Sequence, residues 1–579
     1  MRRLSIIDLV GGHQPIYNET RDLVSICNGE LYNFQGLARQ LEDLGHVFAT
    51  ASDVEVAVHG YEAWGDDFVT RINGMFALAM WDVRRQRLLL ARDRMGKKPL
   101  YYAQLPGGLA FASELRSLLA FPAAAWTVDR DACRTFCLLG YLPGDRTPIA
   151  QIRRLPPGHL AVWARNDFTM RRYWEPEPAP PPPSEPEAAD ALLELLCDAV
   201  RLRLISDVPL GAFLSGGLDS SVVVAVAAGR LGARIPTFNI SFPGYADYDE
   251  AHHARRVADH FGCKHHEIPV DSSHFEDLGA VVWALDEPLA DPAALPTLLL
   301  SREARKEVTV ALTGEGADEV FGGYERYSLA LRGSALAGRL GILRSLAAAG
   351  LRVRRRRSAD DSRVSRLLRS AAEGDASPLA WSRSVASAPA VVEAAGWERR
   401  EVMVLRDSGE MTHSRGNGRL VALQLDDLGS ALANGLLVKV DRMSMAASLE
   451  ARCPFLDYRV VNFGLGLPDA WKIRRRTGKV LLRRAVQQLL PRGIHDRAKH
   501  TFRVPLAQWL RGPLRDLVRE AASSPVLAKF GIVRGEAIRD LAEDHVVGRA
   551  DFSRALWAVV TLHLWLAEAT RHVRLDPTE

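Results

Sequence analysis

The sequence lacks the features that mark membrane, secreted and metal-cluster proteins. No apolar run is long enough to span a bilayer. Met1–Ile6 carries basic residues without the apolar core of a signal peptide. The six cysteines have no metal-ligand spacing, and Cys133 and Cys137, one helical turn apart, are more typical of packing than of ligation. These absences predict a cytoplasmic protein in a reducing compartment.

A strong excess of charge of one sign is also missing. The 579 residues include 74 basic and 70 acidic side chains, a formal net charge of +4. This small value argues against a dedicated nucleic-acid binder. The run Arg354–Arg357 suggests an anion patch, but Asp360 and Asp361 follow it, which favours a solvated helix face or loop. We therefore expect small-molecule substrates, with no nucleic acid and no membrane as partners.

The chain divides at a proline-rich stretch. Residues 1–172 alternate short apolar runs with turn signals, a pattern typical of an α+β or layered sandwich. Glu175–Pro186 is too rich in proline for a helix or an interior strand, which predicts a semi-rigid linker over residues 173–187. A recognition motif for a proline-binding partner is the alternative. In residues 188–579, strands and helices alternate, as in a parallel doubly wound sheet, until about Tyr327, after which the pattern is mostly helical.

The most distinctive turn lies between an apolar run at 208–214 and an Ala- and Val-rich segment at 221–230. It reads Ser215-Gly216-Gly217-Leu218-Asp219-Ser220. Backbone N–H groups and hydroxyls gathered where a strand enters a helix suit a phosphate, and Asp219 could hold a cation beside it. The turn lacks the Walker A lysine pattern, and an ordinary strand–helix turn is the plain alternative.

A second polar loop, Thr313–Glu319, follows another predicted strand, Val308–Thr313. Ligands of doubly wound sheets gather at the carboxyl ends of strands, so this loop and the first turn are expected at one edge. Glu315 and Asp318 offer carboxylates for Mg²⁺ or for proton transfer. The alternative is a polar loop that caps a helix.

Several other polar segments carry little signal alone. Lys479 would ordinarily be solvent-exposed, and the charged segments 441–445 and 450–457 predict a buried ion-pair network. In the first part, Asn28-Gly29-Glu30 and Ser52-Asp53 have turn chemistry, and Arg3 could hold a carboxylate through its two-pronged guanidinium.

Together these motifs indicate a protein family. It resembles glutamine-dependent asparagine synthetases of the bacterial B type over nearly its whole length. The matching motifs are Arg3–Asp8, Asn28–Asn33, Asn73–Phe76, Arg92–Tyr101, Ser215–Ser220, Gly314–Tyr324, Asp441–Met445 and Pro454–Asp457. The resemblance implies an incomplete Ntn-type αββα glutaminase sandwich at 1–172. It also implies an α/β doubly wound parallel-sheet ATP-pyrophosphatase domain with a largely helical C-terminal part at 188–579, and it leaves a homodimer open.

The implied reaction has two steps and uses ATP and Mg²⁺. Aspartate is activated as β-aspartyl-AMP with release of pyrophosphate, and ammonia then displaces AMP to give asparagine. By motif match, the pyrophosphate loop comprises Ser215, Gly216, Gly217, Asp219 and Ser220. Asp219 and Asp318 would bind Mg²⁺, Glu315 would be the base for ammonium and Lys479 would stabilise phosphate charge. The adenosine would lie against Leu214, Ile240, Thr313 and Gly314.

The resemblance also implies a glutamine site. There Arg3 would hold the glutamine carboxylate and Asp53 its amine, Asn28 and Gly29 would form the oxyanion hole, and Glu30 would line the site. The family opens with Met-Cys-Gly-Ile, and its cysteine is the nucleophile. This sequence opens Met1-Arg2-Arg3-Leu4. We therefore expect the chain as written to use free ammonia, unless its start codon is wrongly assigned.

Two alternatives remain at the level of sequence. Relatives in this family amidate other carboxylates in antibiotic, polysaccharide or lasso-peptide pathways, and Ala293 and Leu298 stand where related enzymes often have Ser and Tyr. The second alternative is a non-catalytic scaffold, against which the intact synthetase motifs argue.

Overall fold

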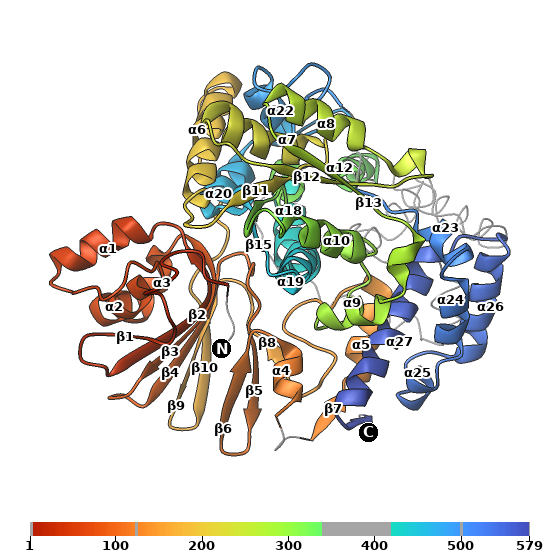
Figure 1. Ribbon diagram of the computed structural model, residues 1–579, viewed down its shortest axis with the longest axis horizontal. Helices are drawn as coiled ribbons and strands as arrows, with labels where there is room; N and C mark the ends of the chain where they lie inside the picture. Colours follow the sequence, from red (N-terminus) through yellow and green to blue (C-terminus); the bar gives the residue numbers. More distant parts are fainter. Residues whose placement is uncertain (1–3, 122–124, 338–417, 498–501, 578–579) are drawn as a thin grey trace.

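The computed structural model describes residues 4–121, 125–337, 418–497 and 502–577 (Figure 1). Arg3 and the run Arg354–Arg357 lie outside the described residues, so the predictions about them stay predictions. Among the described helices, none combines the length and the apolar character needed to cross a membrane.

The N-terminal part, residues 4–174, is built on a six-stranded sheet. Its order is β1-β2-β3-β4-β9-β10, and each neighbouring pair is antiparallel. The strands are β1 Ile16–Tyr17, β2 Leu23–Leu31, β3 Gly74–Asp82, β4 Arg87–Arg92, β9 His159–Ala164 and β10 Asp167–Arg172. The alternation of apolar runs and turns noted in the sequence thus corresponds to strands of this sheet.

Alternating side chains of this sheet pack into two apolar cores, one on each face. Leu78 and Met80 of β3 face a core shared with the helices α1 Phe34–Asp43, α2 Glu55–Trp64 and α3 Phe68–Arg71. Ala77 and Ala79 face the opposite core, shared with Tyr102. Tyr102 belongs to a three-stranded sheet of order β6-β5-β8, with bounds β5 Tyr101–Leu105, β6 Gly108–Ala112 and β8 Arg153–Arg154. The described layers are therefore helix, sheet and sheet.

The C-terminal part, residues 185–577, contains the predicted parallel sheet. Its order is β13-β12-β11-β14-β15 and all its pairs are parallel. The strands are β11 Leu210–Phe213, β12 Thr237–Ser241, β13 His265–Pro269, β14 Val310–Leu312 and β15 Glu450–Arg452. The edge strand β15 was not predicted, because its charged sequence indicated only an ion-pair network.

Helices cover both faces of this sheet (Figure 1). One apolar core holds α6 Glu185–Arg203, α7 Leu218–Val224 and α22 Val480–Val486, and α8 Ala251–His260 packs beside them. The other holds α9 Leu278–Ala284, α10 Ala294–Ala304 and α19 Leu437–Ala446. Among the described residues, the remaining α-helices are α4 Leu115–Leu119, α5 Arg130–Leu139, α11 Ala317–Phe321, α12 Glu325–Ala337, α18 Arg419–Asp427, α20 Tyr458–Gly466, α21 Asp469–Lys472, α23 Leu506–Arg511, α24 Arg515–Ala522, α25 Pro525–Lys529, α26 Gly535–Val546 and α27 Ser553–His572.

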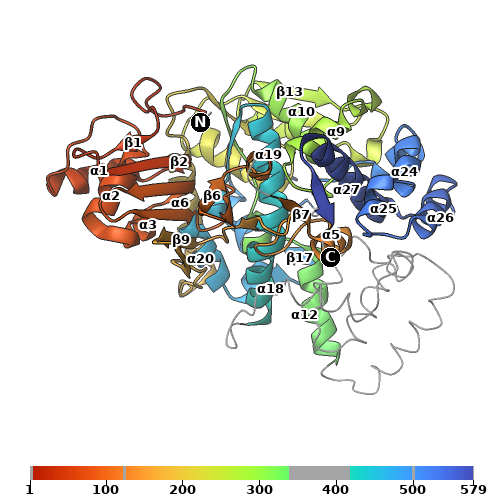
Figure 2. The same cartoon turned by 90° about the horizontal axis from the view of Figure 1, so that it is seen from below.

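The end of the chain returns to the N-terminal part (Figure 2). Strand β18, Leu575–Pro577, pairs in parallel with β7, Trp126–Val128. The long helix α27 shares a core with α5 and α9, so the mostly helical C-terminal part expected after Tyr327 also packs against residues 126–139. A short hairpin of β16 Ile473–Arg474 and β17 Thr477–Gly478 precedes α22.

The proline-rich segment is extended but not a free spacer. The Ala179 N–H donates to the carbonyl of Asn462 at 2.9 Å. A Cβ on Gly466 would lie 1.7 Å from the Ala179 carbonyl oxygen, so glycine is needed for this close approach. Helix α6 begins at Glu185, inside the linker predicted to extend to residue 187, because Ser184 caps it and Pro186 is tolerated in its first turn. The domain limits at 172 and 188 remain predictions.

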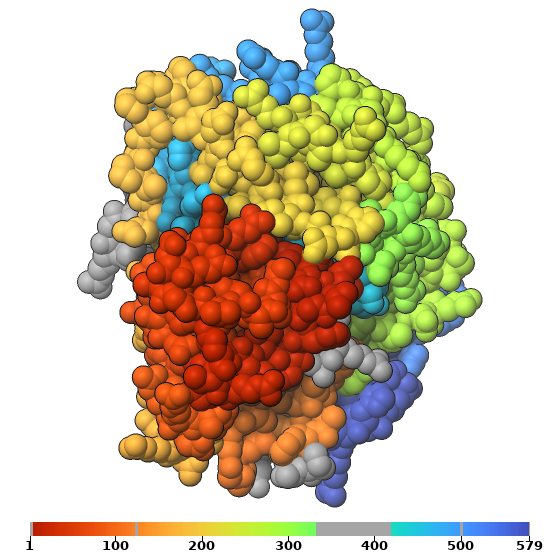
Figure 3. Space-filling model, turned by 60° about the vertical axis from the view of Figure 1, so that its left-hand side comes forward, coloured from red at the N-terminus to blue at the C-terminus, as the bar shows by residue number. Residues whose placement is uncertain are grey.

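Buried ion pairs join the two parts, which lie against each other in Figure 3. On the C-terminal side of this interface, Arg203 lies 3.2 Å from Asp457, and both side chains are fully buried. The Asn73 amide of the N-terminal part donates to Asp457 at 2.9 Å. Lys98 pairs with Asp441 at 2.9 Å in the same interface. These contacts confirm the ion-pair network predicted for 441–445 and 450–457.

Removing one partner of such a pair should be costly. We expect Asp457→Asn to destabilise the protein by about 3–5 kcal/mol, because Arg203 would keep a buried charge without its counter-ion. Burial alone would raise the pKa of Asp457, but hydrogen bonds from Arg459 and the charge of Arg203 lower it. The pair therefore contributes above the normal aspartate pKa and is lost as pH falls.

Thermal unfolding of this variant checks the expectation. The control is Arg571→Gln, which breaks an exposed pair with Glu568 and should leave Tm nearly unchanged. Equal Tm values for Asp457→Asn and wild type at neutral pH would contradict this role for the pair.

Candidate active site

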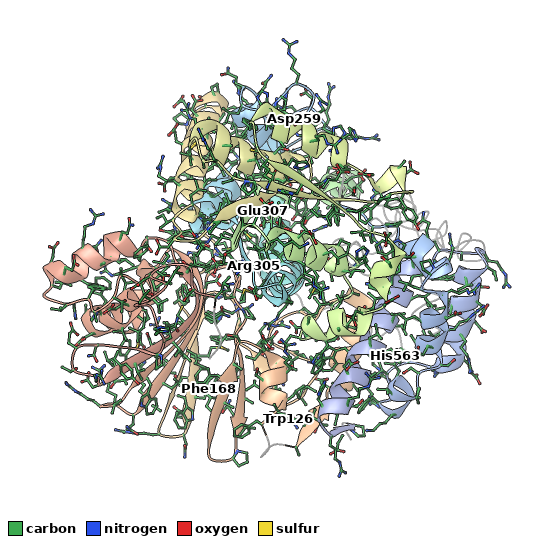
Figure 4. The ribbon with its side chains drawn as sticks, viewed as in Figure 1. Trp126, Phe168, Asp259, Arg305, Glu307 and His563 are labelled. Carbon is green, nitrogen blue, oxygen red and sulfur yellow. The ribbon has the colours of Figure 1, made fainter. Side chains whose placement is uncertain are left out.

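A cavity of about 360 Å³ lies at the carboxyl ends of β11, β12 and β14. Arg305 and Glu307, labelled in Figure 4, precede β14 and therefore lie toward its amino end, away from the cavity. The cavity is lined by every predicted synthetase-site residue except Gly216: Leu214, Ser215, Gly217, Asp219, Ser220, Ile240, Thr313, Gly314, Glu315, Asp318 and Lys479. The first turn and the Thr313–Glu319 loop thus lie at one edge, as predicted from the doubly wound topology. Lys479, which only the family resemblance assigned to the site, lies with them although it is 265 residues beyond Leu214.

The first turn is shaped by its own hydroxyl groups. The Ser220 hydroxyl accepts from the Ser215 N–H at 3.1 Å and lies 3.0 Å from the Ser215 hydroxyl. Gly216 has φ +73°, and a Cβ there would lie 2.5 Å from the backbone nitrogen of Ala254 in α8. Gly216 is therefore needed for the fold of the turn, although it does not line the cavity.

The two predicted loops touch through their backbones. A Cβ on Gly314 would lie 2.8 Å from the backbone nitrogen of Ser220, so no larger residue fits between the loops. The Thr313 N–H donates to the carbonyl of Arg452 at 2.9 Å, which ties the second loop to the edge strand β15. The spacing of the two loops is consequently fixed by main-chain contacts.

Lys479 occupies the centre of the site's charges. Its ammonium lies 2.6 Å from a carboxylate oxygen of Asp219 and 2.6 Å from one of Asp318, and its side chain is only 2 % exposed. The residue stands at the start of α22 with φ +58°, a left-handed conformation that is costly for lysine. A Cβ on Gly323 would lie 1.9 Å from Asp318 and 2.2 Å from the Lys479 side chain. Glycine at 323 thus leaves the room that this contact requires.

The two carboxylates fit a hard divalent cation. Mg²⁺ is commonly bound by one or two carboxylates together with substrate phosphates. Asp219 and Asp318 approach one ammonium from two different loops, which shows that they can share a single positive charge.

Two glutamates lie beside these aspartates. Glu315 lines the cavity and is half-buried. Glu319 lines it too, and burial together with the nearby Asp318 charge raises its pKa to about 7. The Tyr324 hydroxyl donates to Glu319 at 2.6 Å. Sequence reasoning overlooked Glu319, although it ends the very loop that was singled out.

Basic side chains complete the lining. Lys439 lies 2.9 Å from Asp291, and both border the cavity. Arg497 pairs with Glu250 and donates to the carbonyl of Gly216 at 3.1 Å. Lys439 could have been suspected from its place two residues before Asp441, whereas no local pattern distinguishes Arg497.

The predicted glutamine-site residues that the structure describes, all except Arg3, lie on or beside β2. The Asn28 amide donates to the Ser113 hydroxyl at 3.1 Å, and a Cβ on Gly29 would lie 1.9 Å from the Met75 carbonyl oxygen. Asp53 accepts from the Leu31 N–H at 2.7 Å.

Glu30 lies 3.3 Å from Arg452 of β15. Burial and the charges of Asp53 and Glu450 raise the pKa of Glu30 well above its usual value. Glu30 therefore sits in the interface between the two parts, a placement that the sequence did not indicate.

Comparison with known proteins agrees with this geometry. The asparagine synthase family model matches residues 191–567, more than half of the chain, and the glutamine amidotransferase domain model matches residues 1–174. The chain belongs to the asparagine synthase family. As such it is a carbon–nitrogen ligase of the glutamine-hydrolysing asparagine synthase type, and its family makes asparagine at the expense of ATP.

Individual relatives span most of this asparagine synthase family member. It is 32% identical to asparagine synthetase [glutamine-hydrolyzing] 1 of Bacillus subtilis (strain 168), covering 97% of this chain and 88% of that protein. Asparagine synthetase [glutamine-hydrolyzing] 3 of the same strain is 31% identical, covering 86% and 79%. Amidase chry2 of Gibberella zeae is 28% identical, covering 93% and 85%.

The space left by Gly323 can be tested directly. We expect Gly323→Ala to lower ATP-dependent amide formation at least tenfold, because the added methyl would displace Lys479 or Asp318 by more than an ångström. Steady-state kinetics and Tm measure the two effects separately. In the control, Gly36→Ala, the methyl meets nothing within 4 Å, so activity should be retained. Wild-type kcat/KM in Gly323→Ala would show that the contact is dispensable.

Proposed function

We propose that the chain activates the side-chain carboxylate of aspartate with ATP as β-aspartyl-AMP, releases pyrophosphate, and lets ammonia displace AMP. A carboxylate is a poor electrophile, and adenylylation provides the leaving group that ammonia can displace. The observation that supports this most strongly is the placement of Lys479 between Asp219 and Asp318, at the junction of the two loops. There it would meet the phosphate chain of ATP.

Each part of this site has an assigned task. Ser215, Gly217 and Ser220 would bind the β- and γ-phosphates through N–H and hydroxyl groups. Asp219 and Asp318 would hold Mg²⁺, which offsets phosphate charge. The adenosine would pack against Leu214, Ile240, Thr313 and Gly314, which line the same cavity.

The first step requires stabilisation of negative charge. An aspartate oxygen attacks the α-phosphorus, the bond to the bridging oxygen breaks, and pyrophosphate leaves with that oxygen. Lys479 would stabilise the charge that develops on the phosphates, and its buried position strengthens this effect.

The second step requires a base. Ammonium must lose a proton before its nitrogen attacks the acyl carbon, and AMP then leaves with the carboxylate oxygen. We assign this proton to Glu315, which borders the cavity on the same loop as Asp318. Glu319, with its raised pKa, would take part in relaying the proton onward.

For the nitrogen source, we propose free ammonia for the polypeptide as given. Within residues 1–174 the cysteines are Cys27, Cys133 and Cys137, and all three are buried. Burial raises the pKa of Cys137 to about 12 and that of Cys133 well above normal, which disfavours thiolate formation.

A different acceptor carboxylate is the second candidate. Ala293 lines the cavity, whereas Leu298 is buried behind it. A 28% identical relative carries the name amidase, not asparagine synthetase. This combination favours testing other carboxylates beside aspartate.

Two substitutions should separate the two steps. Lys479→Ala should lower ATP–pyrophosphate exchange with aspartate by at least 10²-fold, because charge on the phosphates loses its partner. Glu315→Gln should keep exchange within about tenfold of wild type but lose asparagine formation, because only the second step needs the base. Lys264→Ala, which removes an exposed lysine paired with Glu307, is the control. Loss of exchange in Glu315→Gln would contradict its assignment to the second step.

The nitrogen source is tested with the same polypeptide. We expect asparagine to form from aspartate, ATP and ammonium, and none to form when glutamine is the sole nitrogen donor. Amino-acid chromatography measures both reactions. Equal rates with glutamine and ammonium would show that another group in this chain hydrolyses glutamine.

A further inference from the structure

A group of histidines and glutamates lies outside the cavity, in the N-terminal part. It consists of Glu19 in the β1–β2 loop, His46 just after α1, and His59 and Glu62 on α2. One ligand atom from each residue lies within 4.8 Å of the others. Figure 1 shows α2 on the side of the N-terminal part that faces away from helices α23–α27. We refer to these four residues as the His–Glu cluster.

The distances within the His–Glu cluster match those of a metal site. Tetrahedral bonds of about 2.0–2.2 Å place neighbouring ligand atoms roughly 3.3–3.6 Å apart. His59 Nδ1 lies 3.4 Å from Glu19, and His46 Nδ1 lies 3.5 Å from Glu19 and 3.9 Å from Glu62. The rings of the two histidines approach to 5.1 Å between centroids. Small rotations of the glutamates, which are more than a third exposed, would complete the tetrahedron.

The second observation is the buried state of His59. Its side chain is 1 % exposed, and its Nδ1 has no hydrogen-bond partner. Its other nitrogen, Nε2, lies 3.3 Å from the equally buried Glu55. An Nε2–H that donates to Glu55 leaves a lone pair on Nδ1, directed at Glu19. A carboxylate behind a histidine is the usual way in which proteins orient a metal-binding imidazole.

The glutamates are oriented as well. The Val47 N–H donates to Glu19 at 2.9 Å, and the Asn18 amide donates to Glu62 at 3.2 Å. The cluster therefore has two imidazole and two carboxylate donors, and His59 and both glutamates are oriented by neighbours outside the cluster.

We propose that Glu19, His46, His59 and Glu62 bind a divalent transition-metal ion of the Zn²⁺ type as a structural site. Imidazole and carboxylate donors suit such ions, and four protein ligands leave no open position for catalysis. The ion ties three separate segments together. One of them, after His46, leads to the loop whose N–H groups at residues 49 and 50 donate to Glu55.

The structural role follows from where this loop ends. It runs directly into Asp53, which accepts from the Leu31 N–H of β2. Binding of the ion would reduce the freedom of the loop in the folded state and would raise the stability of the N-terminal part by mass action. It would not alter the cavity around Lys479, which belongs to the other part.

Metal content of the full chain tests the proposal. The protein is stripped with chelator, exposed to Zn²⁺ or Co²⁺, and freed of excess ion. We expect about one Zn²⁺ per chain by elemental analysis, visible absorption bands typical of tetrahedral Co²⁺, and a higher Tm with Zn²⁺. The variants His46→Gln and Glu62→Gln, at less buried positions than His59, should each weaken binding at least tenfold and remove the gain in Tm.

The control is His13→Gln, which removes an exposed histidine of the same part and should bind the ion as wild type does. Glu55→Gln, behind His59, should weaken binding by about 10–100-fold. Absence of bound Zn²⁺ in wild type would overturn the proposal. Undiminished binding in both His46→Gln and Glu62→Gln would overturn it equally.

Discussion

The contact of Lys479 with Asp219 and Asp318 is the constraint on which the rest of the synthetase part depends. Burying an ammonium costs free energy unless carboxylates lie beside it, so the three residues must be held together accurately. They come from three elements that the sheet and its helices bring to one edge. The glycines at 314 and 323 remove the side chains that would push these elements apart. The same arrangement leaves the cavity in which we propose that the phosphates of ATP and their cation bind.

Strand β15 links this site to the N-terminal part. The backbone carbonyl of Arg452 accepts a hydrogen bond from the Thr313 N–H. The guanidinium of Arg452 pairs with Glu30 and donates to the carbonyls of Arg203 and Ile205. One buried residue thus contacts the Thr313–Glu319 loop, the end of α6 and the N-terminal part. Buried ion pairs of this kind are sensitive to the loss of either partner. Packing of the N-terminal part and the geometry of the cavity are therefore coupled through the backbone of this short strand.

Much of the fold followed from local patterns. The alternation of strands and helices around Ser215–Ser220 and Thr313–Glu319 indicated one sheet edge, and the cavity contains both loops. Strand β15 escaped prediction because its buried glutamate and arginine pair with each other and Arg452 also needs partners distant in sequence, Glu30 and Arg203. The same holds for Arg497 in the cavity and for His59, whose neighbours come from three segments. Tertiary contacts of single polar residues produce no periodic pattern in the sequence, so local patterns could not predict them. The roles that were assigned to residues by motif remain predictions for experiment.

Transfer of oxygen from the acceptor to AMP tests the central claim most directly. Aspartate labelled with ¹⁸O in its side-chain carboxylate is converted with ATP and ammonium, and the nucleotide and pyrophosphate products are analysed by mass spectrometry. If the carboxylate attacks the α-phosphorus in the cavity around Lys479, each AMP carries one labelled oxygen and pyrophosphate carries none. Unlabelled AMP, or ADP as the nucleotide product, would contradict the account.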